Sequence, residues 1–213
     1  MYKKLDDGVY IFHESLGVRA VEGWNTENNE DVVGVLIIED EHQIVVALED
    51  SAENLTWSKK YDYDSINLPI IGLENTEFDF NGEYYCKNQN LDSPDFPAAY
   101  YCLNYKKGGR NWYLPSSGEL WLIYRHLEEI QTALSIVGGQ KFITTWVNGS
   151  IPCYWSSTEN SATCACVLDL HAESLGDWRH KVTLRRKVRP VSNFNQLVKH
   201  GNNKCEKRVV RFN

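Results

Sequence analysis

Trp155-Ser-Ser-Thr-Glu159 and Val188-Arg-Pro-Val191 enclose a segment of very different character, and Trp112-Tyr-Leu-Pro-Ser-Ser-Gly-Glu-Leu120 lies upstream of both. The three blocks have the composition of a fixed framework. The enclosed segment, 160–187, holds Cys, His, Trp, Arg and Leu in no clear alternation. A rigid scaffold that carries an irregular and chemically diverse segment is typical of a binding surface, whereas an enzyme needs a few fixed groups in fixed places.

The clearest helix signal begins at the first of these blocks. Ser116 and Glu119 have the S-x-x-E spacing of a capping box. Apolar residues then recur at intervals of three and four up to Val137, and Gly138-Gly139 provides the stop. The pattern predicts a single helix that covers a sheet.

The other elements are shorter. Strands are predicted at 8–13, 32–38 and 43–48, with Glu39-Asp-Glu41 as the turn of a hairpin between the last two. A short helix is predicted from Phe96 to about Tyr105, after a long structured loop at 50–95. Further strands are predicted around 142–147, 152–156, 164–170, 180–185 and 187–191. Two helices with a small antiparallel sheet and long loops define an α+β fold.

Charge divides the chain into two halves. Residues 1–97 contain 21 acidic and 6 basic residues, whereas residues 98–213 contain 8 acidic and 16 basic ones. Residues 178–189 hold six of the bases and no acid. Two interpretations stand: a solvated strand pair facing the acidic half of the molecule, or a basic face for an anionic partner such as an acidic glycan. Nucleic acid is not expected as a partner, because no recognised binding module accompanies the charge.

The six cysteines do not form a metal-binding pattern. Cys164-Ala-Cys166 has no second close pair to complete a zinc site. On a strand the two thiols would share a face about 7 Å apart, too far for a mutual disulfide. Independent side chains, some disulfide and a shared metal are the three possibilities, and no metal or cofactor is predicted. Cys102, among apolar neighbours, is predicted to be a core residue.

The N-terminus does not resemble a signal peptide, and no stretch approaches the eighteen apolar residues of a membrane span. The predicted organisation has three parts. Residues 1–30 form an N-terminal strand segment packed on the main domain, residues 31–195 form that domain, and residues 196–213 form a basic tail.

The order of the motifs resembles a known family. W-Y-L-P-S-x-x-E-L, a helix, Y-W-S-S-T-E, a divergent segment and V-R-P-V are similar to the Lcl C-terminal-like domains of bacterial and phage proteins, which have a C-type-lectin fold. The resemblance is closest to the bacteroidal and phage variable proteins of diversity-generating retroelements, which are related to the phage major tropism determinant. Asp79-Phe-Asn-Gly82 also resembles the D-[FY]-x-G turn of such domains. The resemblance covers about residues 30–195.

The resemblance implies a diversified receptor-binding face. In that family, adenine-directed mutagenesis varies residues of the C-terminal strands and loops. The residues it places on this face, within 160–187, are Asn160, Thr163, Cys164, Cys166, Leu168, His171, Asp177, Trp178, Arg179, His180, Thr183, Leu184 and Arg185. The implied partner is a protein or glycan receptor on a target cell, together with a carrier protein of a virion or appendage. The implied location is a virion or cell surface.

The framework residues are assigned structural roles. Trp112, Leu114, Pro115, Glu119, Trp155, Arg189 and Pro190 make up this set. Arg189 is expected to pair with an acid or with backbone carbonyls. Two roles are left open for Glu159: a turn residue or part of the binding rim.

Two other functions compete with receptor binding. One is a non-diversified assembly module of a virion or appendage. The other is an oxidase of the formylglycine-generating type, for which Cys164 and Cys166 are the only close cysteine pair. No combination of nucleophile, base and orienting residue can be identified in the sequence, so the chain is not expected to be an enzyme. The calcium-dependent sugar motifs of true C-type lectins, E-P-N or Q-P-D with W-N-D, are absent from the sequence, and no calcium requirement is predicted.

Overall fold

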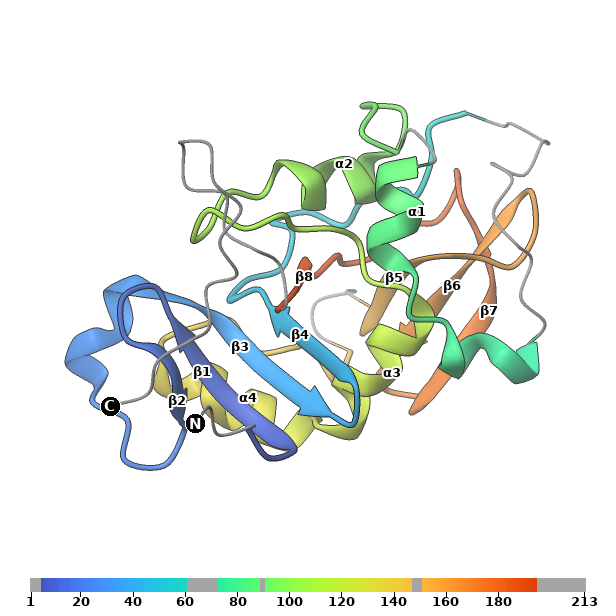
Figure 1. Cartoon of the computed structure of the whole chain (residues 1–213). Helices are drawn as coiled ribbons and strands as arrows, with labels where there is room; N and C mark the ends of the chain where they lie inside the picture. Colours follow the sequence, from blue (N-terminus) through green and yellow to red (C-terminus); the bar gives the residue numbers. More distant parts are fainter. Residues whose placement is uncertain (1–4, 61–72, 89–90, 147–150, 195–213) are drawn as a thin grey trace.

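β-branched runs form the centre of the larger sheet. The computed structural model describes residues 5–60, 73–88, 91–146 and 151–194. Strand β3 (Val32–Glu39) is buried except at its last residue, because both faces of this sheet are covered. It pairs with β1 (Gly8–His13) on one side and β4 (His42–Val46) on the other. The edges are β2 (Gly17–Ala20) and β8 (Val191–Asn193), giving the antiparallel order β2-β1-β3-β4-β8 (Figure 1).

The predicted hairpin between the second and third strands is confirmed. Glu39 is paired with His42, and Asp40 in the turn has a φ of 55°, a left-handed conformation that aspartate tolerates. β1 is hydrogen-bonded along β3, so the strands nearest the N-terminus belong to the same sheet as the rest of the domain.

A second antiparallel sheet contains the irregular segment. Its order is β5 (Cys153–Glu159), β6 (Cys164–Asp169) and β7 (Ser174–His180), with register shifts in both pairings. The predicted strand at 180–185 is wrong, because the chain turns at Lys181, whose carbonyl accepts hydrogen bonds from Trp57 N and Ser58 N. β7 comes earlier than predicted.

The predicted strand at 142–147 is also wrong over the residues that the structure describes there, 142–146. The side chain of Gln131 forms hydrogen bonds with both the backbone N–H and the backbone carbonyl of Phe142. Its Oε1 accepts from Phe142 N at 2.8 Å, and its Nε2 donates to Phe142 O at 3.0 Å. These bonds replace the strand pairing that the sequence suggested.

The single long helix is in fact two. The chain is helical at α3 (Ser117–Arg125) and α4 (Leu127–Ile136), with a break at His126, where φ is −106° and ψ is 19°. His126 Nε2 lies 2.8 Å from Glu39 Oε2, so a contact with the larger sheet accompanies the break. An apolar stripe continues across such a break, which is why periodicity alone misses it. The remaining helices of the described residues are α1 (Gly82–Asn88), which was not predicted, α2 (Pro97–Asn104) and the 3-10 helices η1 (Thr26–Asp31) and η2 (Leu73–Phe78).

One core joins the two sheets. It includes Val35 and Ile37 of β3, Leu120 of α3, and Trp155 and Val167 of the smaller sheet, all fully buried. In Figure 1, α4 lies against β1 and β3, and α3 packs against β5 and β6. The α+β class is therefore confirmed, with more helices and one more sheet than the sequence predicted. No helix in the described ranges is long and apolar enough to cross a membrane.

Candidate functional site

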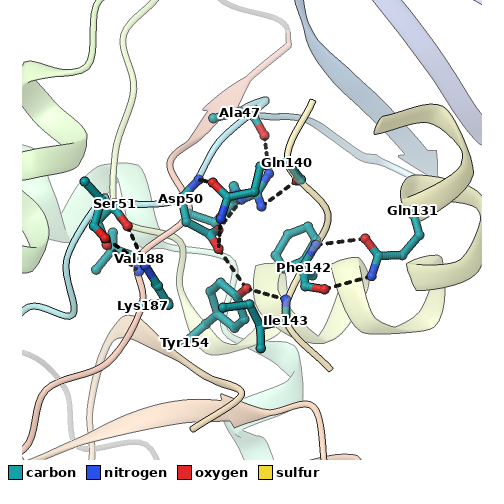
Figure 2. Close-up of polar contacts among 12 residues, drawn as sticks. Ala47, Asp50, Ser51, Gln131, Gln140, Phe142, Ile143, Tyr154, Lys187 and Val188 are labelled. Carbon is teal, nitrogen blue, oxygen red and sulfur yellow. Dashed lines mark hydrogen bonds and ion pairs between the residues drawn. The ribbon is translucent and has the colours of Figure 1, made fainter. Parts of the chain in front are cut away.

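A buried ion pair anchors the last framework block. Arg189 is fully buried and pairs with Asp50, which is equally shielded from solvent. Its Nη1 and Nη2 donate to Ala47 O and Gln140 O, each at 2.9 Å. Figure 2 shows Asp50 with Tyr154, whose hydroxyl donates to Asp50 Oδ2 at 3.0 Å. Arg189 thus interacts with both an acid and backbone carbonyls, and Pro190 is buried beside it.

A second buried polar cluster fixes the start of α3. Ser116 N donates to Glu119 Oε2 at 2.7 Å, which completes the predicted capping box, and the Tyr113 hydroxyl donates to Glu119 Oε1 at 2.7 Å. Asp79 accepts from the Thr158 hydroxyl at 2.6 Å and from the Tyr85 hydroxyl at 2.9 Å. Ser117 N donates to Thr158 Oγ1 at 2.8 Å, which ties the helix start to the end of β5. Trp112, Leu114, Pro115 and Trp155 are buried as well.

Glu119 makes the stability of the fold depend on pH. Burial raises its pKa from 4.5 to about 7, although the hydrogen bonds from Ser116 and Tyr113 oppose the shift. The unfolded chain loses this proton near pH 4.3, whereas the folded chain keeps it to about pH 7. The folded state therefore binds more protons between these values, and the contribution of Glu119 falls as pH rises through them.

Between pH 4.5 and pH 8, the free energy of unfolding of wild type is expected to fall by on the order of 3 kcal/mol more than that of Glu119→Gln. Urea unfolding of both proteins across this range measures it. Subtracting the two curves removes the contributions of the other carboxyl groups. Parallel curves for the two proteins would show that Glu119 titrates normally.

A second buried charge pair supports the end of the smaller sheet. Lys181 is 4% exposed and forms an ion pair with the fully buried Glu159. Its Nζ also donates to Ala162 O at 2.9 Å and lies 4.7 Å from the ring centroid of Trp57. Burial lowers the pKa of Lys181 and the Glu159 carboxylate opposes this. Glu159 is therefore an internal ion-pair partner at the end of β5, which is neither of the two roles left open for it.

The structure distributes the candidate binding residues unevenly. Those near the turn between β5 and β6, at the end of β7 and in the segment after it are partly or fully exposed: Asn160, Thr163, Cys164, Arg179, His180, Thr183, Leu184 and Arg185. Lys181 N donates to Thr163 O at 2.9 Å, and Cys164 is paired directly with His180, so these segments lie side by side. We call this set of eight residues the strand-end surface.

Three groups of candidates fall outside the strand-end surface. Cys166 and Leu168 are 1% and 0% exposed, so their side chains belong to the interior of the sheet and are not available to a ligand. Their place on β6 explains this, because both faces of that strand are covered. His171 is exposed in the turn between β6 and β7, at the opposite end of the sheet. Asp177 and Trp178 belong to β7, and their side chains are outside the described part.

The basic run is not the solvated strand pair or the continuous basic face that the sequence suggested. Lys181, Arg186, Lys187 and Arg189 are at most 9% exposed. Lys187 Nζ donates to Ser51 O at 2.9 Å and to Ala52 O at 3.1 Å. Lys187 and Arg189 therefore hold the loop after β7 against the acidic first half of the chain, whereas Lys181 pairs with Glu159.

The five described cysteines carry free thiols. Cys102 is fully buried, as predicted for a core residue. Cys164 is partly exposed and Cys166 is buried, so the two thiols of the C-x-C pair do not share an accessible face. Cys205 lies outside the described residues, as does the tail predicted at 196–213.

Comparison with known proteins gives a likeness of fold. No family model matches the chain, and no curated protein matches it significantly. Among solved structures, the chain is similar to a fimbrial protein from Bacteroides ovatus, with a TM-score of 0.60 and 15% sequence identity. The match covers 89% of this chain and 49% of the fimbrial chain, so this chain corresponds to about half of that protein. The α+β arrangement described above is thus one that a Bacteroides fimbrial protein also has.

Proposed function

We propose that this chain is a binding domain of the adhesin type, carried on a bacterial surface appendage, and that its strand-end surface contacts a protein or glycan receptor on another cell. The observation that carries the proposal is the construction of that surface. Irregular, chemically mixed loops are exposed to solvent, while the charge pair of Lys181 and Glu159 beneath them is buried. Preorganised loops on a rigid scaffold lose little entropy when they bind.

The finer proposal is that the domain is a C-type-lectin-like variable protein of a diversity-generating retroelement. The buried framework blocks and the exposed residues between them support this assignment. The fold likeness to a fimbrial protein favours a cell surface over a virion as the location. The proposed role is binding without catalysis, and the differing accessibility of Cys164 and Cys166 agrees with it.

Receptor binding can be tested with a charge-reversing double variant. Thr183→Glu/Arg185→Glu changes two exposed side chains of the strand-end surface. We expect it to weaken binding to intact target cells at least tenfold, about 1.4 kcal/mol, as measured by titration in a flow cytometer. Thr132→Glu/Lys141→Glu is the matched control, because it replaces one exposed threonine and one exposed lysine elsewhere with the same change in charge. Equal binding by the two variants would contradict the proposal.

Diversification is tested by sequencing the locus from its natural population. The proposal expects adenine-confined variation in the codons of the strand-end surface. It also expects invariance at Cys166 and Leu168, since substitutions there would disturb packing. Variation spread evenly over all bases, or absent from the strand-end surface, would remove the retroelement mechanism.

The likeness to a fimbrial protein also favours a second candidate, an assembly module of an appendage. This role predicts a stable complex with a neighbouring subunit of the same appendage. Size-exclusion chromatography of the coexpressed proteins distinguishes it from receptor binding. The double variant Thr183→Glu/Arg185→Glu should leave such a complex intact if the strand-end surface serves a receptor instead.

A further inference from the structure

A buried histidine holds the turn between β1 and β2. His13 is the last residue of β1 and is 3% exposed. Its Nδ1 atom accepts hydrogen bonds from Ser15 N and Leu16 N, each at 3.1 Å, and the Ser15 hydroxyl lies 3.4 Å from the same atom. Gly17, with a left-handed φ of 74°, then begins β2 opposite His13. One ring nitrogen is therefore the acceptor for two backbone N–H groups of the turn.

These partners fix the protonation state of the ring. A backbone N–H can only donate, so Nδ1 must offer its lone pair, and the single proton of the neutral ring is then on Nε2. A second proton would bind to Nδ1 and make it a donor that faces two other donors. The protonated imidazole and the closed turn, with its two bonds to Nδ1, therefore exclude each other.

No charged group of the described residues forms an ion pair with the ring. Its remaining contact is with the Trp24 ring, at 5.8 Å between centroids. β1 has no charged residue, and Glu39 lies at the other end of β3, since His13 pairs with Val32. Charges screened by water act weakly on a buried group. The other charged residues on the elements around the ring are exposed acids, one partly exposed arginine and two glutamates in the first turn of α4: Glu14, Glu22, Glu27, Glu30, Asp31, Arg19, Glu128 and Glu129.

The turn controls an edge of the larger sheet. β2 is the outer strand of that sheet and pairs with β1. Leu16, at the tip of the turn, is an apolar side chain that is 37% exposed. Figure 1 shows this hairpin on the side of the larger sheet that lies away from β5, β6 and β7. Opening the turn would therefore loosen an edge strand and leave the smaller sheet in place.

We propose that His13 is a pH-sensitive switch. Uptake of a proton at Nδ1 breaks the hydrogen bonds from Ser15 N and Leu16 N and opens the turn between β1 and β2. Histidine side chains change charge between about pH 5 and pH 8, so the turn is closed at the upper end of this range and open at the lower end. The switch does not depend on the proposed function, because the strand-end surface belongs to the other sheet.

Hydrogen exchange measured by NMR at pH 7.5 and pH 5 tests the switch. Exchange rates are divided by the intrinsic rate of each amide at the same pH, which gives a protection factor. We expect the protection factors of Ser15 N and Leu16 N to fall about tenfold or more on acidification. The amides of Val35 and Leu36 in β3 are the internal control, because they report opening of the whole sheet and should keep their protection.

His13→Asn separates the acceptor from its titration. Asn Oδ1 occupies the position of Nδ1 and accepts from backbone N–H groups two and three residues further on, but takes up no proton in this range. We expect both amides to stay protected at pH 7.5 and at pH 5. His13→Leu removes the acceptor, so both amides should be unprotected at both pH values. His171→Gln is the matched control, since it removes an exposed histidine of another turn and should respond to pH as wild type does.

Each outcome decides for or against the switch. Unchanged protection of Ser15 N and Leu16 N in wild type would overturn it, whether the ring takes up a proton without effect or takes up none. Loss of protection in His13→Asn at pH 5 would also overturn it, because another group would then cause the opening. If His13→Leu does not fold, the comparison of wild type with His13→Asn remains sufficient. Loss of protection in wild type alone, with His13→Asn unaffected, is the result that supports the switch.

Discussion

Arg189→Met is expected to lower the free energy of unfolding by about 3–5 kcal/mol, because it leaves the Asp50 carboxylate buried without its cation. The carbonyls of Ala47 and Gln140 lose their donors at the same time. Urea unfolding followed by tryptophan fluorescence measures the change. The hydrogen bond from Tyr154 to Asp50 remains and limits the loss.

Arg125→Met is the control for this prediction. Arg125 pairs with Glu39, but the two side chains are 37% and 27% exposed. An exposed pair contributes about 0–1 kcal/mol, so this variant should unfold close to wild type. A second variant, Asp50→Leu/Arg189→Met, removes both charges and should recover part of the stability lost by Arg189→Met alone. Similar losses in Arg189→Met and Arg125→Met would show that burial of the Asp50–Arg189 pair has no energetic consequence.

The sequence predicted local structure best where one signal dominated. The β3–β4 hairpin was predicted because two apolar runs flank an acidic turn, and the capping box at Ser116 because its two residues have a fixed spacing. The break at His126 was missed, since α3 and α4 share one apolar stripe and the residue that accompanies the break pairs with Glu39, far away in sequence. Strand β7 was misplaced because its sequence does not alternate and its register contains a bulge.

The site was less predictable, because composition does not tell which charges are buried. Lys181, Lys187 and Arg189 look like a solvated basic run in the sequence, yet their partners include Glu159, Asp50 and backbone carbonyls that only the tertiary fold brings close. Arg186 was not selected as a candidate at all. Whether its Nε atom finds a hydrogen-bond partner depends on the path of the whole loop, and no local sequence pattern predicts that path.

The buried pair of Lys181 and Glu159 links stability to the proposed binding surface. Lys181→Met is expected to cost about 3–5 kcal/mol in unfolding free energy, since Glu159 is then a buried carboxylate without its cation. The carbonyl of Ala162 also loses its donor, and the cation above the Trp57 ring is gone. Lys60→Met is the control, because Lys60 pairs with Asp95 at the surface, where the side chains are 66% and 38% exposed. It should change the stability by less than about 1 kcal/mol.

The same variant should loosen the turn between β5 and β6 more than the rest of the sheet. Asn160 N and Lys181 N, which donate to Cys164 O and Thr163 O, are the amides to follow by hydrogen exchange. Faster exchange there than at the amides of β3 would show that the charge pair holds the strand-end surface in place. Glu159→Gln/Lys181→Met also removes the carboxylate charge and should recover part of the stability, while the turn, still lacking its contact to Ala162, should remain loose. If the double variant is no more stable than Lys181→Met, or if exchange at the turn is unchanged in both, the pair does not support the surface in the way proposed.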